Sequence, residues 1–144
     1  MKEYIVIMKS DIAHKIKHRK FANDEFYTPR ELAQRLVDML SPSLGDRDSI
    51  MDNAARGNDV FYRCFPTWIP RRRSFHKDFL KMDNKQSWFV TNPPYSFLDE
   101  WIRHSCEMAK KGFAYLLGFN NITPRRIEMC EKMGFYITKI NILS

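Results

Sequence analysis

Short apolar runs alternate with segments of helical spacing along this chain. Apolar runs of strand length occur at residues 3–8, 49–52, 88–90, 113–119 and 135–143. Between them, apolar side chains recur at helical spacing after Pro29, after Ser96 and after Pro124. Strands that alternate with helices predict an α/β fold with a mostly parallel sheet.

Local signals set the expected ends of these elements. Thr28-Pro29-Arg30-Glu31 has the pattern of a capping box, with proline in the first helical turn, so we expect a helix that ends near Ser41. Gly112 is expected to end the helix that starts near Ser96. Residues 74–77 are expected to form a further strand.

The segment Thr91-Asn92-Pro93-Pro94-Tyr95 follows one expected strand and precedes a helix. Neither proline can donate to a strand ladder, so the backbone must leave the sheet there, at an edge where α/β sheets bind ligands. The Asn92 amide oxygen and the Pro93 carbonyl are two acceptors suited to the two N–H bonds of an exocyclic amine. Tyr95 has a flat face on which a planar base can stack. An ordinary turn with a buried aromatic residue is the alternative interpretation.

Asn92-Pro93-Pro94-Tyr95 resembles the catalytic motif of amino-group methyltransferases that use S-adenosylmethionine. That family includes enzymes acting on adenine or cytosine amines in DNA, on RNA, and on a protein glutamine. The resemblance implies that Asn92 and the Pro93 carbonyl hold the target amine while Tyr95 stacks on a flipped base. It also implies a Rossmann-like methyltransferase fold from Phe26 onward.

A second segment, Phe26-Tyr27-Thr28-Pro29, is similar to a cofactor-side motif of many DNA adenine methyltransferases. In that family the aromatic-Thr-Pro segment precedes the main domain and packs beside the methionine end of the cofactor. The resemblance implies that these four residues contact S-adenosylmethionine. It also favours nucleic-acid enzymes over the glutamine-methylating relatives.

The loop that begins at Asp52 resembles the cofactor loop of the same family, usually written Asp-Pro-Ala-(Ala/Cys)-Gly-x-Gly. Asp52, Ala54 and Ala55 fit this pattern. The resemblance implies that Asp52, Ala54 and Gly57 bind the cofactor. Glycine in such a loop allows positive φ and a close approach of the backbone to the ligand.

The glycine positions of this loop can be aligned in two ways. If Arg56 is an insertion, Gly57 takes the first glycine position and Asp59 takes the second. Without an insertion, Arg56 and Asn58 replace both glycines. Asn and Asp tolerate left-handed geometry better than other side chains, which favours survival of the turn.

Asp78-Phe79-Leu80 resembles the family segment whose acid meets the adenine amine of the cofactor, which implies that Asp78 and Phe79 bind cofactor. A surface acid in a basic stretch is the alternative for Asp78. The family also has an acid that binds the cofactor ribose, but residues 61–73 contain no Asp or Glu. The chain is therefore expected to be shortened, by about one strand–helix unit, between the cofactor loop and the catalytic loop.

The net charge of +7 favours a polyanionic partner. Residues 63–85 are the most basic part of the chain, and we expect Arg71, Arg72 and Arg73 to bind nucleic acid; a solvated loop is the alternative. We assign residues 1–20 to a basic N-terminal arm. Residues 21–144 are expected to be a single catalytic domain without a separate target-recognition domain, so that a dimer or a partner chain would supply target recognition.

Cysteine usage and hydropathy suggest the setting. The three cysteines show no metal-ligand spacing, and their odd number argues against a disulfide framework. We therefore expect no metal site and a reducing, cytoplasmic environment. The apolar run at residues 3–8 is too short to cross a membrane.

These patterns lead to one main hypothesis, methyl transfer from S-adenosylmethionine to the 6-amino group of adenine in DNA by direct attack of the amine. One alternative is an amino-group methyltransferase that acts on RNA, cytosine or a protein glutamine. The other is a non-catalytic descendant of the fold that binds nucleic acid, which the altered glycine loop and the missing ribose acid favour.

Overall fold

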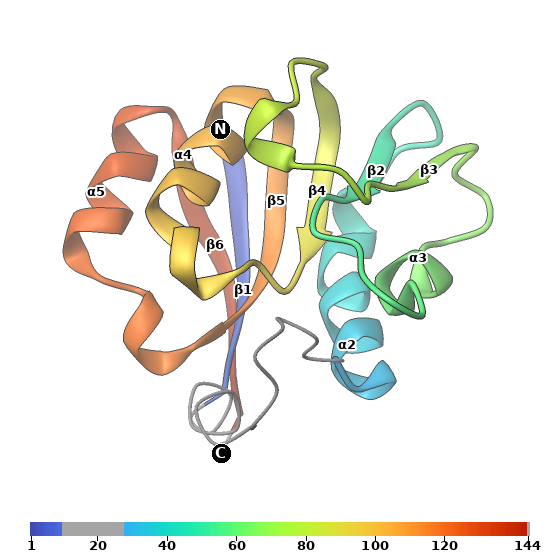
Figure 1. Ribbon diagram of the computed structural model, residues 1–144, viewed down its shortest axis with the longest axis horizontal. Helices are drawn as coiled ribbons and strands as arrows, with labels where there is room; N and C mark the ends of the chain where they lie inside the picture. Colours follow the sequence, from blue (N-terminus) through green and yellow to red (C-terminus); the bar gives the residue numbers. More distant parts are fainter. Residues whose placement is uncertain (10–27, 144) are drawn as a thin grey trace.

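The computed structural model describes residues 1–9 and 28–143, which form a six-stranded sheet covered by helices on both faces (Figure 1). The strand order is β3-β2-β4-β5-β1-β6, and every neighbouring pair is parallel. The prediction of an α/β fold with a mostly parallel sheet is confirmed, and the described sheet is parallel throughout.

The strands are β1 Lys2–Lys9, β2 Ser49–Asp52, β3 Arg71–Ser74, β4 Gln86–Thr91, β5 Ala109–Gly118 and β6 Phe135–Leu143. The α-helices are α2 Arg30–Leu40, α3 Val60–Cys64, α4 Leu98–Met108 and α5 Pro124–Lys132. Short 3-10 turns include η2 Phe79–Lys81 and η3 Tyr95–Phe97.

Two apolar layers hold the helices to the sheet. On one face, Val6, Phe89 and Phe113 of the sheet belong to one apolar cluster with Trp101 of α4 and Cys130 of α5. On the other face, strands β1, β4 and β5 pack against α2 and α3 through a separate apolar cluster. Side chains that alternate between the two clusters along each central strand explain why β4 and β5 are buried on both faces.

Strand β1 occupies an interior position, because it pairs with β5 on one side and β6 on the other. Its residues belong to the stretch that we assigned to a basic N-terminal arm. Residues Tyr4 to Ile7 are almost completely buried, so this part of the chain lies within the sheet. The remainder of the assigned arm lies outside the described residues.

Strand β3 differs from the prediction of a strand at residues 74–77. The strand is Arg71–Ser74, and it pairs residue by residue with β2. Phe75, the first residue after the strand, forms two backbone hydrogen bonds with the loop after β2. Its N–H donates to the Asp52 carbonyl (2.9 Å), and its carbonyl accepts from the Ala55 N–H (3.2 Å). Three consecutive arginines are tolerated in a strand here because β3 is at the edge of the described sheet.

Two predicted helix boundaries are also wrong. Pro29, with ψ of 138°, is the N-cap of α2, and no side chain caps this helix. Thr28 is one residue too early to act as the cap, so the predicted capping box does not form. Helix α4 ends at Met108, and Gly112 lies inside β5 instead of ending the helix.

Gly112 is required where the backbones and side chains of three strands converge. It pairs with Glu3 of β1 and with Trp88 of β4. A Cβ atom at this position would lie well inside van der Waals contact with the Glu3 carbonyl oxygen and 2.6 Å from the Trp88 ring. Only glycine therefore allows β5 to pair closely with both neighbours.

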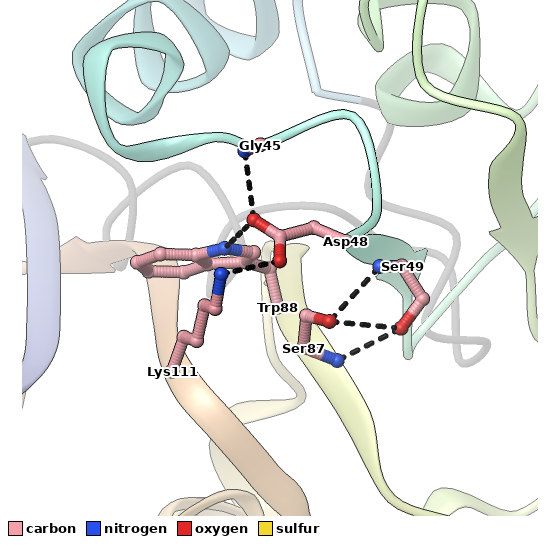
Figure 2. Close-up of polar contacts among 6 residues, drawn as sticks. All are labelled: Gly45, Asp48, Ser49, Ser87, Trp88 and Lys111. Carbon is pink, nitrogen blue, oxygen red and sulfur yellow. Dashed lines mark hydrogen bonds and ion pairs between the residues drawn. The ribbon is translucent and has the colours of Figure 1, made fainter.

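At the amino ends of β2, β4 and β5, a set of polar contacts is centred on Asp48 (Figure 2). Its carboxylate accepts hydrogen bonds from the Gly45 N–H (2.8 Å) and from Trp88 Nε1 (3.2 Å), and it forms an ion pair with Lys111. Beside it, the backbone N–H groups of Ser49 and Ser87 each donate to the hydroxyl of the other residue (2.9 and 2.8 Å). These contacts link β2, β4 and β5 near their amino ends, in addition to the backbone ladders.

Gly112→Ala is expected to lower the free energy of unfolding by roughly 3 kcal/mol, because the added methyl group meets a backbone oxygen and an indole ring that cannot both move. Urea unfolding followed by circular dichroism measures this change. Gly45→Ala is the control, since its Cβ would come no closer than 3.6 Å to Asp48. Equal stability of the two variants would contradict the packing argument.

Asp48→Asn tests the ion pair separately from the other hydrogen bonds. Burial opposes ionisation of Asp48, but contacts with Lys111, Gly45 and Trp88 lower its pKa overall. Because Lys111 is half exposed, we expect a loss of about 1–2 kcal/mol at pH 7. The deficit should disappear as the pH falls through the lowered pKa of Asp48. Asp46→Asn, at an exposed position, should change neither the stability at pH 7 nor its dependence on pH. If the deficit of Asp48→Asn persists at acid pH, the charge of Asp48 is not the source of that deficit.

Candidate functional site

The parallel pairing of β2 with β4 brings the ends of these strands to the same edge of the sheet. Asp52 is the last residue of β2, and Thr91 is the last residue of β4. A pocket at this edge is lined by residues of three segments: Thr28; Asp52, Ala54, Arg56, Asn58, Val60 and Phe61; and Thr91 to Ser96. The structure therefore brings together most of the residues that the motifs indicated.

Asn92 connects the two segments that resemble opposite sides of the methyltransferase site. Its Nδ2 atom donates to the Thr28 hydroxyl (3.4 Å), which is buried. Its Oδ1 atom is also buried but has no hydrogen-bond partner within the described residues. A buried acceptor without a partner costs about 1–3 kcal/mol, so this amide oxygen is suited to a ligand that donates an N–H.

Tyr95 lies half-buried at the start of η3, with its ring packed against the apolar cluster of α2 and α3. Burial raises the pKa of its phenol well above the usual value. The hydroxyl is therefore protonated at neutral pH and cannot act as a general base. What the residue contributes to the pocket is the surface of its ring.

Asp52 is the only carboxylate that lines the pocket among the described residues. Burial raises its pKa to about 6, while the Thr91 hydroxyl and the Ala54 N–H (3.1 Å) partly offset this increase. Its charge at neutral pH is therefore held in an environment that disfavours it. A cationic group of a ligand beside Asp52 would stabilise that charge.

The loop after β2 adopts the geometry of one of the two alignments considered above. Gly57 has φ of 51° and Asp59 has φ of 54°, so both are left-handed. If Arg56 is an insertion, these residues take the two glycine positions of the motif, and only Asp59 replaces a glycine. Asp59 adopts this conformation without being glycine, and its carboxylate lies 2.9 Å from His76 Nε2.

Other predicted site residues lie away from the pocket. Asp78 is exposed, and its carboxylate accepts from the Leu80 N–H (3.0 Å) as the cap of η2. Phe79 is fully buried against Phe89 and Trp101, with ring centroids 5.1 and 4.9 Å away. Both therefore have structural roles here, and neither lines the pocket.

The remaining predicted residues are distributed as follows. Pro29 is exposed at the start of α2. The three arginines Arg71, Arg72 and Arg73 lie on β3, where alternation directs them to different faces of the sheet edge. Phe26 and Tyr27 lie outside the described residues.

A buried polar chain behind the pocket was not predicted. Asn53 Nδ2 donates to the Tyr115 hydroxyl (2.9 Å), which also contacts the Ser105 hydroxyl closely. Ser105 donates its only proton to the Trp101 carbonyl (2.6 Å), so Tyr115 must donate to Ser105. The chain links the loop after Asp52 to α4. No spacing in the sequence relates Asn53 to Tyr115, since they meet only through the strand order.

Two further features of the described residues bear on the kind of site. No group of three or more His, Cys, Asp or Glu side chains among them is arranged to hold a metal ion. None of their helices combines the length and apolar character needed to span a bilayer.

Scans against protein-family models, curated proteins and solved structures found no match to this chain.

Asp52→Asn is expected to change how stability depends on pH. The pKa of Asp52 rises from about 4 in the unfolded chain to about 6 in the folded protein, so the native state binds more protons between these values. The free energy of unfolding should therefore fall as the pH rises from 4 to 6, and the variant should lack this decline.

At pH 7 the Asp52→Asn protein is expected to be more stable than the wild type by up to about 3 kcal/mol, measured by urea unfolding. Asp78→Asn is the matched control, because Asp78 is exposed and an asparagine can still cap η2. If the free energy of unfolding of Asp52→Asn still fell by the same amount between pH 4 and 6, another titrating group would be the cause of the decline.

Proposed function

We propose that this protein transfers a methyl group from S-adenosylmethionine to the 6-amino group of adenine in DNA. The observation that carries the proposal is the convergence of Thr28, Asp52 and Asn92 on one pocket at the carboxyl edge of the sheet. These residues come from three separate segments, and each segment resembles a different part of the same methyltransferase site. Chance similarity in one motif would not require the other two to lie beside it.

At the amine end of the pocket, Asn92 supplies an acceptor that has no described partner. The Thr28 hydroxyl accepts from Nδ2 and so holds the amide with its oxygen available. Pro93 adds a carbonyl and cannot add a competing N–H. An exocyclic amine held by these two acceptors becomes more positive as it attacks a methyl group, and the fixed dipoles stabilise that charge.

At the cofactor end, the carboxylate of Asp52 fits a cationic ligand. Bound S-adenosylmethionine would supply an electrophilic methyl group on a positively charged sulfur. Asp52 would hold a cationic portion of that ligand, since burial raises its pKa and a ligand cation would stabilise its charged form. The positive φ angles of Gly57 and Asp59 support the proposal, because a cofactor loop of this kind has glycine where the backbone is left-handed.

One part of the fit is incomplete. β3 is followed by Phe75 and His76, so no carboxylate stands at the end of this strand to bind ribose hydroxyls. His76 instead pairs with Asp59. We propose Asp59 for the ribose role, since its chain neighbours Asn58 and Val60 line the pocket.

DNA is favoured as the substrate by the net charge of +7 and by the resemblance of Phe26-Tyr27-Thr28-Pro29 to DNA adenine enzymes. The acceptors at Asn92 and Pro93 would serve equally for an amine in RNA, in cytosine or in a glutamine side chain. A dimer or a partner chain would supply target recognition. The non-catalytic alternative gains support from Asp59, which stands where the family has glycine.

Asn92→Ala is the decisive variant. The protein would be incubated with isotopically labelled S-adenosylmethionine and mixed-sequence DNA, and the digested nucleosides would be analysed by mass spectrometry. We expect labelled methyladenine with the wild type and a loss of at least about 100-fold in Asn92→Ala, because one of the two amine acceptors is removed. Asn120→Ala, at an exposed position outside the pocket, should retain full activity.

The other outcomes of this experiment separate the alternatives. Label on cytosine, RNA or protein that also requires Asn92 would keep the reaction and change the substrate. Absence of label, together with calorimetry that shows no cofactor binding by the folded protein, would contradict the proposal and favour the non-catalytic alternative.

A further inference from the structure

We propose that β3, at the edge of the described sheet, forms a phosphate-binding pocket separate from the candidate methyltransfer pocket. A cavity of about 440 Å³ lies at this edge, within the range of about 300–1,000 Å³ that is typical of small-molecule sites. Its polar lining consists of Arg72, Arg73, Ser74, Asn84, Gln86 and Asp59. The inference does not depend on methyl transfer.

Arg72 and Ser74 provide hydrogen-bond donors that have no partners. They are two residues apart on β3 and therefore face the same side of the strand. Arg72 Nε and Ser74 Oγ are buried, and neither forms a hydrogen bond with the described residues. Because an unsatisfied buried donor costs about 1–3 kcal/mol, a ligand rich in acceptor oxygens would be stabilised here.

The Arg72 guanidinium is held in place by an aromatic ring. Its Cζ atom lies 6.0 Å from the centre of the Tyr62 ring of α3, within the range of a cation–π contact. Arg72 Nε has no hydrogen-bond partner among the described residues. A planar fork of N–H donors matches the oxygens of a phosphate group, which favours that class of anion.

The charge balance of the cavity also favours an anion. Its lining contains two guanidinium groups and a single carboxylate, Asp59. That carboxylate lies 2.9 Å from His76 Nε2, but its Oδ1 forms no hydrogen bond with the described residues, so the preference for an anion comes from the excess of one guanidinium over the single carboxylate. The side-chain amides of Asn84 and Gln86, which also line the cavity, add neutral donors.

The location of this cavity relates it to the first pocket. Asp59 lines the β3 cavity, while its chain neighbours Asn58 and Val60 line the candidate methyltransfer pocket. The two pockets are therefore separated by one turn of backbone. The phosphate held by Arg72 would belong either to a nucleic-acid strand whose base occupies the candidate methyltransfer pocket or to a free phosphate compound.

Arg72→Gln and Arg71→Gln form a matched pair for testing the proposal. Both substitutions remove one arginine from β3, but only Arg72 lines the cavity. Inorganic phosphate binding would be measured by titration calorimetry, with chloride used to keep the ionic strength constant. We expect Arg72→Gln to weaken binding by at least about tenfold and Arg71→Gln by less than about twofold.

Arg73→Gln provides a second variant at an exposed position that also lines the cavity, so a folding defect in Arg72→Gln would not remove the test. It too should weaken phosphate binding. Absence of phosphate binding by the folded wild type, or equal losses in Arg71→Gln and both cavity variants, would overturn the proposal in favour of non-specific charge.

A single-stranded oligonucleotide of mixed sequence separates the two sources of phosphate. If the ligand is a nucleic-acid backbone, Arg72→Gln should reduce the salt dependence of oligonucleotide binding by about one phosphate contact, and Arg71→Gln should not. If inorganic phosphate binds through Arg72 but oligonucleotide binding is the same in both variants, the pocket serves a free phosphate compound.

Discussion

Parallel pairing of every described strand is the constraint on which the rest of this structure depends. It directs the carboxyl ends of β2 and β4 to one edge, so residues that follow these strands meet in a pocket. The pairing depends in turn on the close packing around β5, where Gly112 lies between Glu3 and Trp88. The position of Asn92 beside Asp52 is thus a consequence of how tightly the interior strands pack.

The two edges of the sheet differ in how well their polar groups are satisfied. At the amino edge, Asp48 has three donors and the serines of β2 and β4 satisfy one another (Figure 2). At the carboxyl edge, Asn92 Oδ1 lacks a partner, and burial of Asp52 disfavours its charge. Polar groups without partners destabilise the fold, so their concentration at one edge is better explained by a ligand than by stability.

The sequence was informative where local chemistry determines structure. The prolines after Thr91 predicted a strand end, and the alternation of apolar runs predicted the parallel sheet. It misled where tertiary contacts override local signals. Gly112 resembles a helix stop, but the proximity of Glu3 and Trp88 requires glycine within a strand. Thr28 resembles a helix cap, but its hydroxyl contacts Asn92, which is far away along the chain. Phe79 matched a cofactor motif, yet its ring fills the core.

The interior position of β1 has a consequence for how the protein folds. Glu3 pairs with Gly112, and Lys2 pairs with Phe135, so the first strand acquires its neighbours only from the last third of the chain. During synthesis β1 must remain unpaired until β5 and β6 have been made, with its apolar side chains exposed for that period. Contacts between such distant segments require closure of long loops and slow the search for the native state. Folding of this sheet is therefore expected to be completed only once β6 has been synthesised, with β1 among the last strands to acquire protection against hydrogen exchange.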